Sequence, residues 1–144
     1  MPESVKLIFP TISPRLKSEE GEKFIWDSLR GKWLVLTPEE WVRQHTIGWL
    51  VTHKGIPALR ITQEYPVKIN GLNQRADIVV VDEKAKPHIL VECKAPDVIL
   101  DHEVVMQAIR YNSIVGARYI LLTNGLKLYG YEYADGKYRG LKEF

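Results

Sequence analysis

The chain has 144 residues, of which 45% are hydrophobic and 26% charged, and its 20 Lys and Arg against 18 Asp and Glu leave a net charge of +2. This length and composition predict one globular domain with a sizeable core, and they exclude a second large domain, a disordered chain and a fibrous protein. The near-neutral charge also lacks the strongly basic character of many nucleic-acid-binding domains.

The N-terminal part of the chain predicts an arm followed by a hairpin. Residues 1–22 hold three prolines and a mixed-charge stretch without sustained periodicity, so we expect an irregular arm with one short strand near residues 5–9. Short apolar runs at residues 24–27 and 32–37 flank the turn signal Arg30-Gly31 and predict a small hairpin. We therefore place a single domain at residues 23–144.

Two helices are predicted from their capping residues. Thr37-Pro38-Glu39-Glu40 supplies an N-cap hydroxyl, a proline in the first turn and a glutamate at the capping-box position, so a helix is expected to run to about His53. Asp101 is placed to cap a second helix that extends to about Gly116.

Runs rich in β-branched and aromatic residues predict the strands. They lie at residues 60–69, 76–81, 88–94, 118–123, 126–133 and 138–141. Pro66 assigns the first of these strands to a sheet edge or a bulge. Together with the helices, the strands predict an α/β sandwich, in which helices flank a central mixed β-sheet and extra strands lie near both termini.

The cellular context is predicted from features that the sequence lacks. A single cysteine, Cys93, cannot form an intrachain disulfide, and no stretch resembles a secretion signal or a membrane span, so a cytoplasmic protein is expected. The four histidines lack zinc-ligand spacing, and no phosphate-binding glycine motif occurs. Zinc enzymes and nucleotide-driven motors are therefore disfavoured.

Acidic and basic side chains gather on the central hairpin. If residues 82–87 form its loop, Asp77 lies opposite Glu92, and directly opposed residues have Cβ atoms about 4.5 to 5.5 Å apart. Opposed carboxylates in a covered sheet need a cation, or one of them stays protonated. Lys94 shares the face of Glu92, and two acids beside a lysine are suited to holding a hard divalent ion and activating a water molecule. The alternative is a surface salt-bridge cluster at a frayed strand end.

Five stretches resemble a nuclease family. Asp77, followed after fifteen residues by Glu92-Cys93-Lys94, resembles the PD-(D/E)XK nuclease motif, with Ala76 where proline is usual. Gln107-Ala-Ile-Arg-Tyr111 resembles the QxxxY motif of a subset of these nucleases. The closest resemblance is to the N-terminal nuclease domain of the type I restriction enzyme R subunit, and it rests also on residues 38–44, 92–96 and 123–125. It covers roughly residues 24–133 and implies a restriction-endonuclease-like fold.

The resemblance also implies roles for the hairpin residues. Asp77 and Glu92 would bind Mg²⁺, for which Mn²⁺ can substitute, and the backbone carbonyl of Cys93 would be a further ligand. Lys94 would position the attacking water or help to deprotonate it.

Gln107 and Tyr111 lie four residues apart and share one face of the second helix. The resemblance implies that they orient Lys94 or contact a DNA phosphate. Without the resemblance, a solvated glutamine and a packing tyrosine would be the simpler interpretation.

The first helix offers a further acid, since many nucleases of this superfamily use a glutamate there. Glu40 begins a stripe that includes Gln44 and ends in apolar, core-facing residues, so Glu40 is our candidate metal ligand and Gln44 a candidate DNA contact. The alternative for Glu40 is a purely capping role toward Thr37. Glu64, on the edge-like strand, is more simply a solvated glutamate than an acid close to the metal.

Three other residues complete the set of candidates. Arg75 and Arg110 are expected to contact DNA phosphates, because they lie close to the motifs in the sequence. Cys93 alternates to the face opposite Glu92 and Lys94, which predicts a small core residue rather than a nucleophile.

These observations predict a Mg²⁺-dependent nuclease domain that hydrolyses DNA phosphodiester bonds as a stand-alone chain. The alternative is a catalytically silent nucleic-acid-binding or assembly module that keeps the nuclease fold. Besides DNA, the expected partners are motor and specificity subunits acting in trans. A homodimer is also expected, because two sites related by a twofold axis would cut both strands.

Overall fold

A six-stranded mixed sheet forms the centre of the protein in a computed structural model, which describes residues 2–144. Its strands, in spatial order, are β4 (Ile61–Ile69), β5 (Leu72–Val81), β6 (Pro87–Cys93), β7 (Tyr119–Thr123), β8 (Leu128–Ala134) and β9 (Lys137–Leu141). Neighbouring strands are antiparallel except for β6 and β7, which run parallel. The predicted α/β architecture with a central mixed sheet is therefore confirmed.

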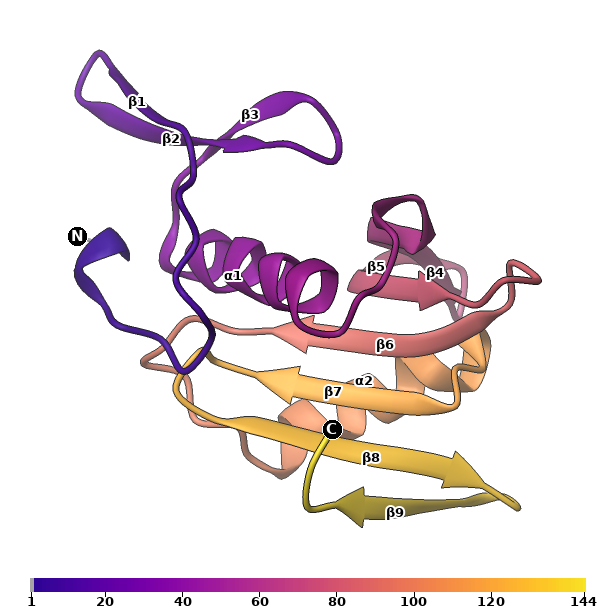
Figure 1. The fold of residues 1–144 in the computed structure, drawn as a ribbon. Coiled ribbons are helices and arrows are strands. Elements are labelled where there is room, and N and C mark those ends of the chain that lie inside the picture. Colours follow the sequence, from indigo (N-terminus) through magenta and orange to yellow (C-terminus); the bar gives the residue numbers. More distant parts are fainter. Residues whose placement is uncertain (1) are drawn as a thin grey trace.

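Two helices cover opposite faces of this sheet (Figure 1). One is α1 (Pro38–Thr52), and the other is α2 (His102–Val115), which connects β6 to the parallel strand β7. Parallel neighbours need such a crossover, because a short turn can join only antiparallel strands. No helix among residues 2–144 is long and apolar enough to span a membrane.

Both helices begin where their caps predicted. The Thr37 hydroxyl accepts a hydrogen bond from the Glu40 backbone N–H (3.0 Å), and the Asp101 carboxylate accepts one from the Val104 N–H (3.2 Å). These bonds satisfy backbone donors that have no partner within the first helical turn. After α2 the chain turns at Gly116, whose φ of +76° suits glycine.

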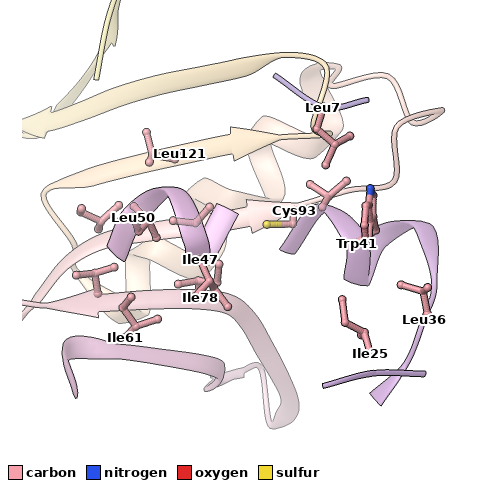
Figure 2. Close-up of a cluster of buried hydrophobic side chains, with 14 residues drawn as sticks. Leu7, Ile25, Leu36, Trp41, Ile47, Leu50, Ile61, Ile78, Cys93 and Leu121 are labelled. Carbon is pink, nitrogen blue, oxygen red and sulfur yellow. The ribbon is translucent and has the colours of Figure 1, made fainter. Parts of the chain in front are cut away.

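The sheet divides the hydrophobic core into two clusters. The cluster beneath α1 joins that helix to the sheet and to the N-terminal segment, and Figure 2 shows its members, among them Leu7, Ile25, Leu50, Ile78, Cys93 and Leu121. The cluster beneath α2 includes Val67, Val79, Leu90, Ala108, Ile120 and Leu122. β6 contributes alternate residues to the two clusters, as a strand covered on both sides must.

β5 and β6 pair in the predicted register through most of their length. Ile78 lies opposite Val91, and Val80 lies opposite Ile89. The register shifts between Val80 and Val81, and Val81 pairs with Pro87. The connecting loop is therefore residues 82–86, one residue shorter than predicted.

A second, three-stranded sheet stands apart from the central one (Figure 1). It consists of β1 (Leu16–Glu19), β2 (Glu22–Asp27) and β3 (Lys32–Val35), all antiparallel. The predicted hairpin is confirmed as β2 and β3. β1 lies in the segment predicted to be irregular, and the division of the chain at residue 22 stays a prediction.

The short strand predicted near residues 5–9 is wrong. That segment has no regular structure, and only short 3-10 turns, η1 (Pro2–Ser4) and η2 (Ala58–Arg60), accompany the helices and strands of residues 2–144. Leu7 and Phe9 are instead buried anchors. The Ile8 N–H donates to the Gly125 carbonyl (2.8 Å), so this segment is tied to the turn after β7.

Candidate functional site

Asp77 and Glu92 are adjacent where the ladder between β5 and β6 ends. The last pair of that ladder joins Ile78 to Val91, and the two acids are the next residues in the same register. Asp77 is half-buried, and its Oδ2 accepts a hydrogen bond from the Cys93 N–H (2.7 Å). Glu92 is only 5% exposed, and its Oε1 has no hydrogen-bond partner among residues 2–144.

The proximity of the two acids changes the protonation of Glu92. Burial, and then the negative charge of Asp77, raise the pKa of Glu92 to about 9, while the Lys94 ammonium acts in the opposite direction. In the metal-free fold Glu92 is therefore protonated at neutral pH. This agrees with the requirement that two opposed carboxylates in a covered sheet either hold a cation or share a proton.

The donor set fits a hard divalent ion. Two adjacent carboxyl groups, one with a buried and unpartnered oxygen, provide the oxygen ligands that Mg²⁺ prefers. Within residues 2–144, no group of three or more His, Cys, Asp or Glu side chains is arranged to hold a metal. A site limited to two carboxylates still suits Mg²⁺, which commonly keeps several of its waters.

Lys94 is held beside the acids by its backbone. Its N–H donates to the carbonyl of Thr123 at the end of β7 (2.9 Å), so the parallel pairing of β6 and β7 fixes where the lysine emerges. The side chain is half-buried, and its charge acts on both Glu92 and Glu39. The loop after Lys94 is secured in turn by Asn124, whose Nδ2 donates to the Val98 carbonyl (2.8 Å).

α2 places Gln107 and Tyr111 on the same side of the sheet as Glu92. Gln107 Nε2 donates to the Tyr111 hydroxyl (3.3 Å), which donates to Gln74 Oε1 on β5 (3.4 Å). Burial, and then the charges of Glu92 and Asp77, raise the pKa of Tyr111. The structure therefore brings the predicted helix pair together with the predicted acids. Gln74 is a neighbour that the sequence did not identify, because nothing in its position marked it.

The first helix presents Glu39 to the acids, whereas Glu40 has other partners. Glu40 is buried, its carboxylate pairs with Arg43, and it accepts a hydrogen bond from Gln44 Nε2 (2.8 Å). Glu39 is largely exposed, yet loss of water around its carboxyl group, and then the charge of Asp77, raise its pKa. Adjacent helix residues point about 100° apart, so the two glutamates face different surroundings.

The three candidate DNA contacts differ in their exposure. Gln44 is buried against Glu40, which places it away from solvent. Arg75 keeps 71% of its side chain exposed and lies 3.9 Å from a carboxylate oxygen of Glu64. Arg110 is exposed and lines a cavity of about 200 Å³ together with Gln107 and Tyr111.

Cys93 is a core residue, as its alternation along β6 predicted. It is fully buried beneath α1, and its Sγ lies 3.8 Å from Thr46 Oγ1. Burial raises the pKa of the thiol well above its ordinary value, so the side chain stays neutral. A nucleophilic role is therefore disfavoured, while its backbone N–H remains part of the site.

Comparison with known proteins finds similar proteins for the part of the chain that holds these residues. A family model described as the N terminus of the type I restriction enzyme R protein (HSDR_N) matches residues 38–144. Among solved structures, a fragment described as an HsdR subunit of a type I restriction enzyme from Vibrio vulnificus YJ016 is 24% identical, with a TM-score of 0.46, over 58% of this chain and 18% of that one. The type IIG restriction endonuclease BpuSI is 18% identical, with a TM-score of 0.49, over 67% of this chain and 11% of that one.

The chain thus spans less than one fifth of either solved relative. No curated protein matches it.

Proposed function

We propose that this chain, which belongs to the type I restriction enzyme R protein N-terminal family, is a metal-dependent nuclease domain that hydrolyses DNA phosphodiester bonds. One observation carries the proposal: two adjacent carboxyl groups, Asp77 and Glu92, lie beside Lys94 where the β5–β6 ladder ends, and the buried Oε1 of Glu92 has no partner among residues 2–144. Such an arrangement costs stability, and a bound cation would offset that cost.

The hairpin residues would divide the chemistry among them. Asp77 and Glu92 would hold Mg²⁺, or Mn²⁺ in its place, with the Cys93 carbonyl as a further donor. When bound, the ion would polarise the phosphate and lower the pKa of a water molecule. Lys94 would hold the attacking water in place and offset the negative charge that develops on the phosphate oxygens.

Residues of the two helices would support this centre. The charges of Asp77 and Lys94 act on the pKa of Glu39 on α1, so we propose Glu39 as an acid close to the metal that is not itself one of the metal ligands. Gln107 and Tyr111 would orient the phosphate. Arg75 and Arg110 are exposed on β5 and α2, and we propose that both contact the DNA backbone.

The wider assembly is part of the same proposal. From its membership of the type I restriction enzyme R protein family, we propose that motor and specificity subunits act with it in trans, in the cytoplasm. A homodimer would place two sites about a twofold axis. Light scattering that gives a monomer at assay concentration would contradict the dimer.

Cleavage of supercoiled plasmid DNA by the purified 144-residue protein tests the proposal. With Mg²⁺ or Mn²⁺ present, wild-type protein should nick the plasmid, and Asp77→Asn, Glu92→Gln and Lys94→Ala should each lower the rate by about 100-fold or more. Asp135→Asn is the matched control, because Asp135 is exposed on the β8–β9 turn and asparagine tolerates its φ of +53°.

Two outcomes would contradict the proposal. Cleavage at the wild-type rate by all three variants would remove these residues from the reaction. Salt-dependent DNA binding without cleavage at any divalent ion would instead favour the catalytically silent binding module.

A further inference from the structure

The side chains of β4 and β5 change the face of the sheet on which they pack at two neighbouring residues, Glu64 and Asp77. Residues an even number apart along a strand normally share a face. In these strands that rule fails across Glu64 and across Asp77. The residues packed beneath α1 are Ile61 and Ile78, whereas those packed beneath α2 are Val67 and Ala76.

A left-handed residue accompanies this change of face. Glu64 has a φ of +54°, a conformation that is costly for a residue other than glycine. Gln63 pairs with Ile78 and Tyr65 pairs with Ala76, in one register, but the described ladder contains no pair between Glu64 and Asp77. Asp77 is thus not paired with β4, and its carboxylate accepts the Cys93 N–H from β6.

The turn between β2 and β3 contacts β4 at this level. Asp27 is fully buried and accepts hydrogen bonds from the backbone N–H groups of Leu29 (3.1 Å) and Arg30 (3.2 Å). Gln63 Nε2 donates to the same carboxylate (2.9 Å). The Arg30 guanidinium pairs with both Asp27 and Glu64, so it joins the turn to the left-handed residue.

The charges around Glu64 favour the same contact. The hydrogen bond from Arg30 is the largest influence on the Glu64 carboxylate, and it lowers the pKa of that group. Arg43 and Arg75 act on it more weakly through their charges. Arg30 therefore stabilises the ionised Glu64 side chain against the β2–β3 turn.

We infer that the β2–β3 turn is a positioning element for the candidate active site. Arg30 holds Glu64 in its left-handed conformation, which keeps Asp77 out of the β4 ladder and leaves its carboxylate oriented by the Cys93 amide. Arg30 is a positioning residue, since it acts through Glu64. The turn precedes residues 38–144, the segment that the family model matches. The inference rests on the proposed function only in treating Asp77 as a reactive-site acid.

The single cysteine supplies a readout that needs neither DNA nor metal. Labelling the full chain with ¹⁵N-cysteine yields one backbone amide signal, that of Cys93, whose N–H is donated to Asp77. The proton shift of that signal reports the hydrogen bond itself rather than the overall stability of the fold. Asp77→Ala defines the position of the signal when the bond is lost.

Two substitutions at Glu64 form the decisive pair. Both Glu64→Ala and Glu64→Gly remove the ion pair with Arg30, but only glycine adopts a φ of +54° without cost. Glu64→Ala is expected to move the Cys93 signal most of the way to its Asp77→Ala position, whereas Glu64→Gly leaves it near the wild-type position. Arg30→Met should shift the signal as Glu64→Ala does, and adding Glu64→Gly should restore it.

Arg139→Met is the matched control, because Arg139 makes an ion pair with Glu132 between β9 and β8, away from the turn. It should leave the Cys93 signal unchanged. Equal positions of the signal in the Glu64→Ala and Glu64→Gly proteins would overturn the inference, even if Arg30→Met does not fold. A protein that shows the expected shifts but never cuts DNA would refute the proposed nuclease and leave this inference standing.

Discussion

Glu92 makes the stability of the metal-free protein depend on pH. Its pKa is raised from 4.5 to about 9 by burial and by the charge of Asp77. Between these values the folded chain holds a proton that the unfolded chain has lost. The free energy of unfolding therefore falls as the pH rises through this window, and the favourable contribution of the protonated group is fully present only below the lower value.

Glu92→Gln should remove this dependence. An amide cannot titrate, so the variant should lose less stability between about pH 5 and pH 9 than the wild-type protein, in which this group contributes a slope of up to about 1.4 kcal/mol per pH unit. Urea unfolding with a chelator present, at a series of pH values, measures the difference. The same slope in both proteins would show that Glu92 is not protonated in the fold.

The acids could be located from the sequence because the predicted register of the β5–β6 hairpin holds from Ile78 to Val80, although the loop is one residue shorter and the register shifts at Val81. That register also predicted the closeness of Asp77 to Glu92 and of Lys94 to both. The choice between Glu39 and Glu40 could not be made in this way. It depends on side-chain pairing, because Glu40 pairs with Arg43 whereas the charge of Asp77 acts on Glu39, and such pairing leaves no mark in hydrophobic periodicity.

The buried side-chain amide of Asn112 links α2 to the segment before β7 and to β9. Asn112 Oδ1 accepts the Ala117 N–H (2.8 Å), and its Nδ2 donates to the Ala117 carbonyl (2.9 Å) and to the Tyr138 hydroxyl on β9 (3.0 Å). These bonds fix the crossover between α2 and β7. They therefore help to hold the helix that carries Gln107 and Tyr111.

Asn112→Ala should lower the free energy of unfolding by about 2–4 kcal/mol, because it leaves buried backbone groups of Ala117 without partners. Tyr138→Phe removes only one of the three bonds and should cost about 1 kcal/mol. Chemical denaturation of the two variants separates these effects. Equal losses would contradict a dominant role for the bonds to Ala117.

The elements that the sequence predicted are those with local signals. Caps at Thr37 and Asp101 marked the helices, and apolar runs marked the central strands. β1 escaped prediction because its four residues are mostly polar and exposed and form a strand only by pairing with β2. The apolar residues near Leu7 suggested a strand for the opposite reason, since they bury side chains without joining a sheet.

The N-terminal segment completes the core of the whole molecule. Leu7, Ile25 and Leu36 belong to the cluster beneath α1, although all three precede the segment that the family model matches. A Cβ atom at Gly125 would lie 2.7 Å from Leu7 Cδ2, which shows how closely this segment approaches the turn after β7. The matched segment alone would expose the surface that these residues cover.

Removal of residues 1–36 should therefore destabilise the protein strongly. Three buried aliphatic side chains contribute about 1.5–3 kcal/mol each, a sum comparable to the total stability of a typical domain. Thermal unfolding and binding of a hydrophobic dye should show a lower transition temperature and exposed apolar surface. Removal of residues 1–4, which spares Leu7, is the control and should change both much less. A fragment of residues 37–144 that melts like the full chain would contradict the prediction.

The rate at which the buried Cys93 thiol is alkylated reports on motion between α1 and the sheet. This thiol is sealed between β6 and Thr46 of α1, so an alkylating reagent reaches the sulfur only when the helix lifts away from the sheet. The same movement of α1 would separate Glu39 from Asp77 and Lys94. The rate of alkylation therefore measures how often the candidate active site comes apart and reassembles in an otherwise folded protein.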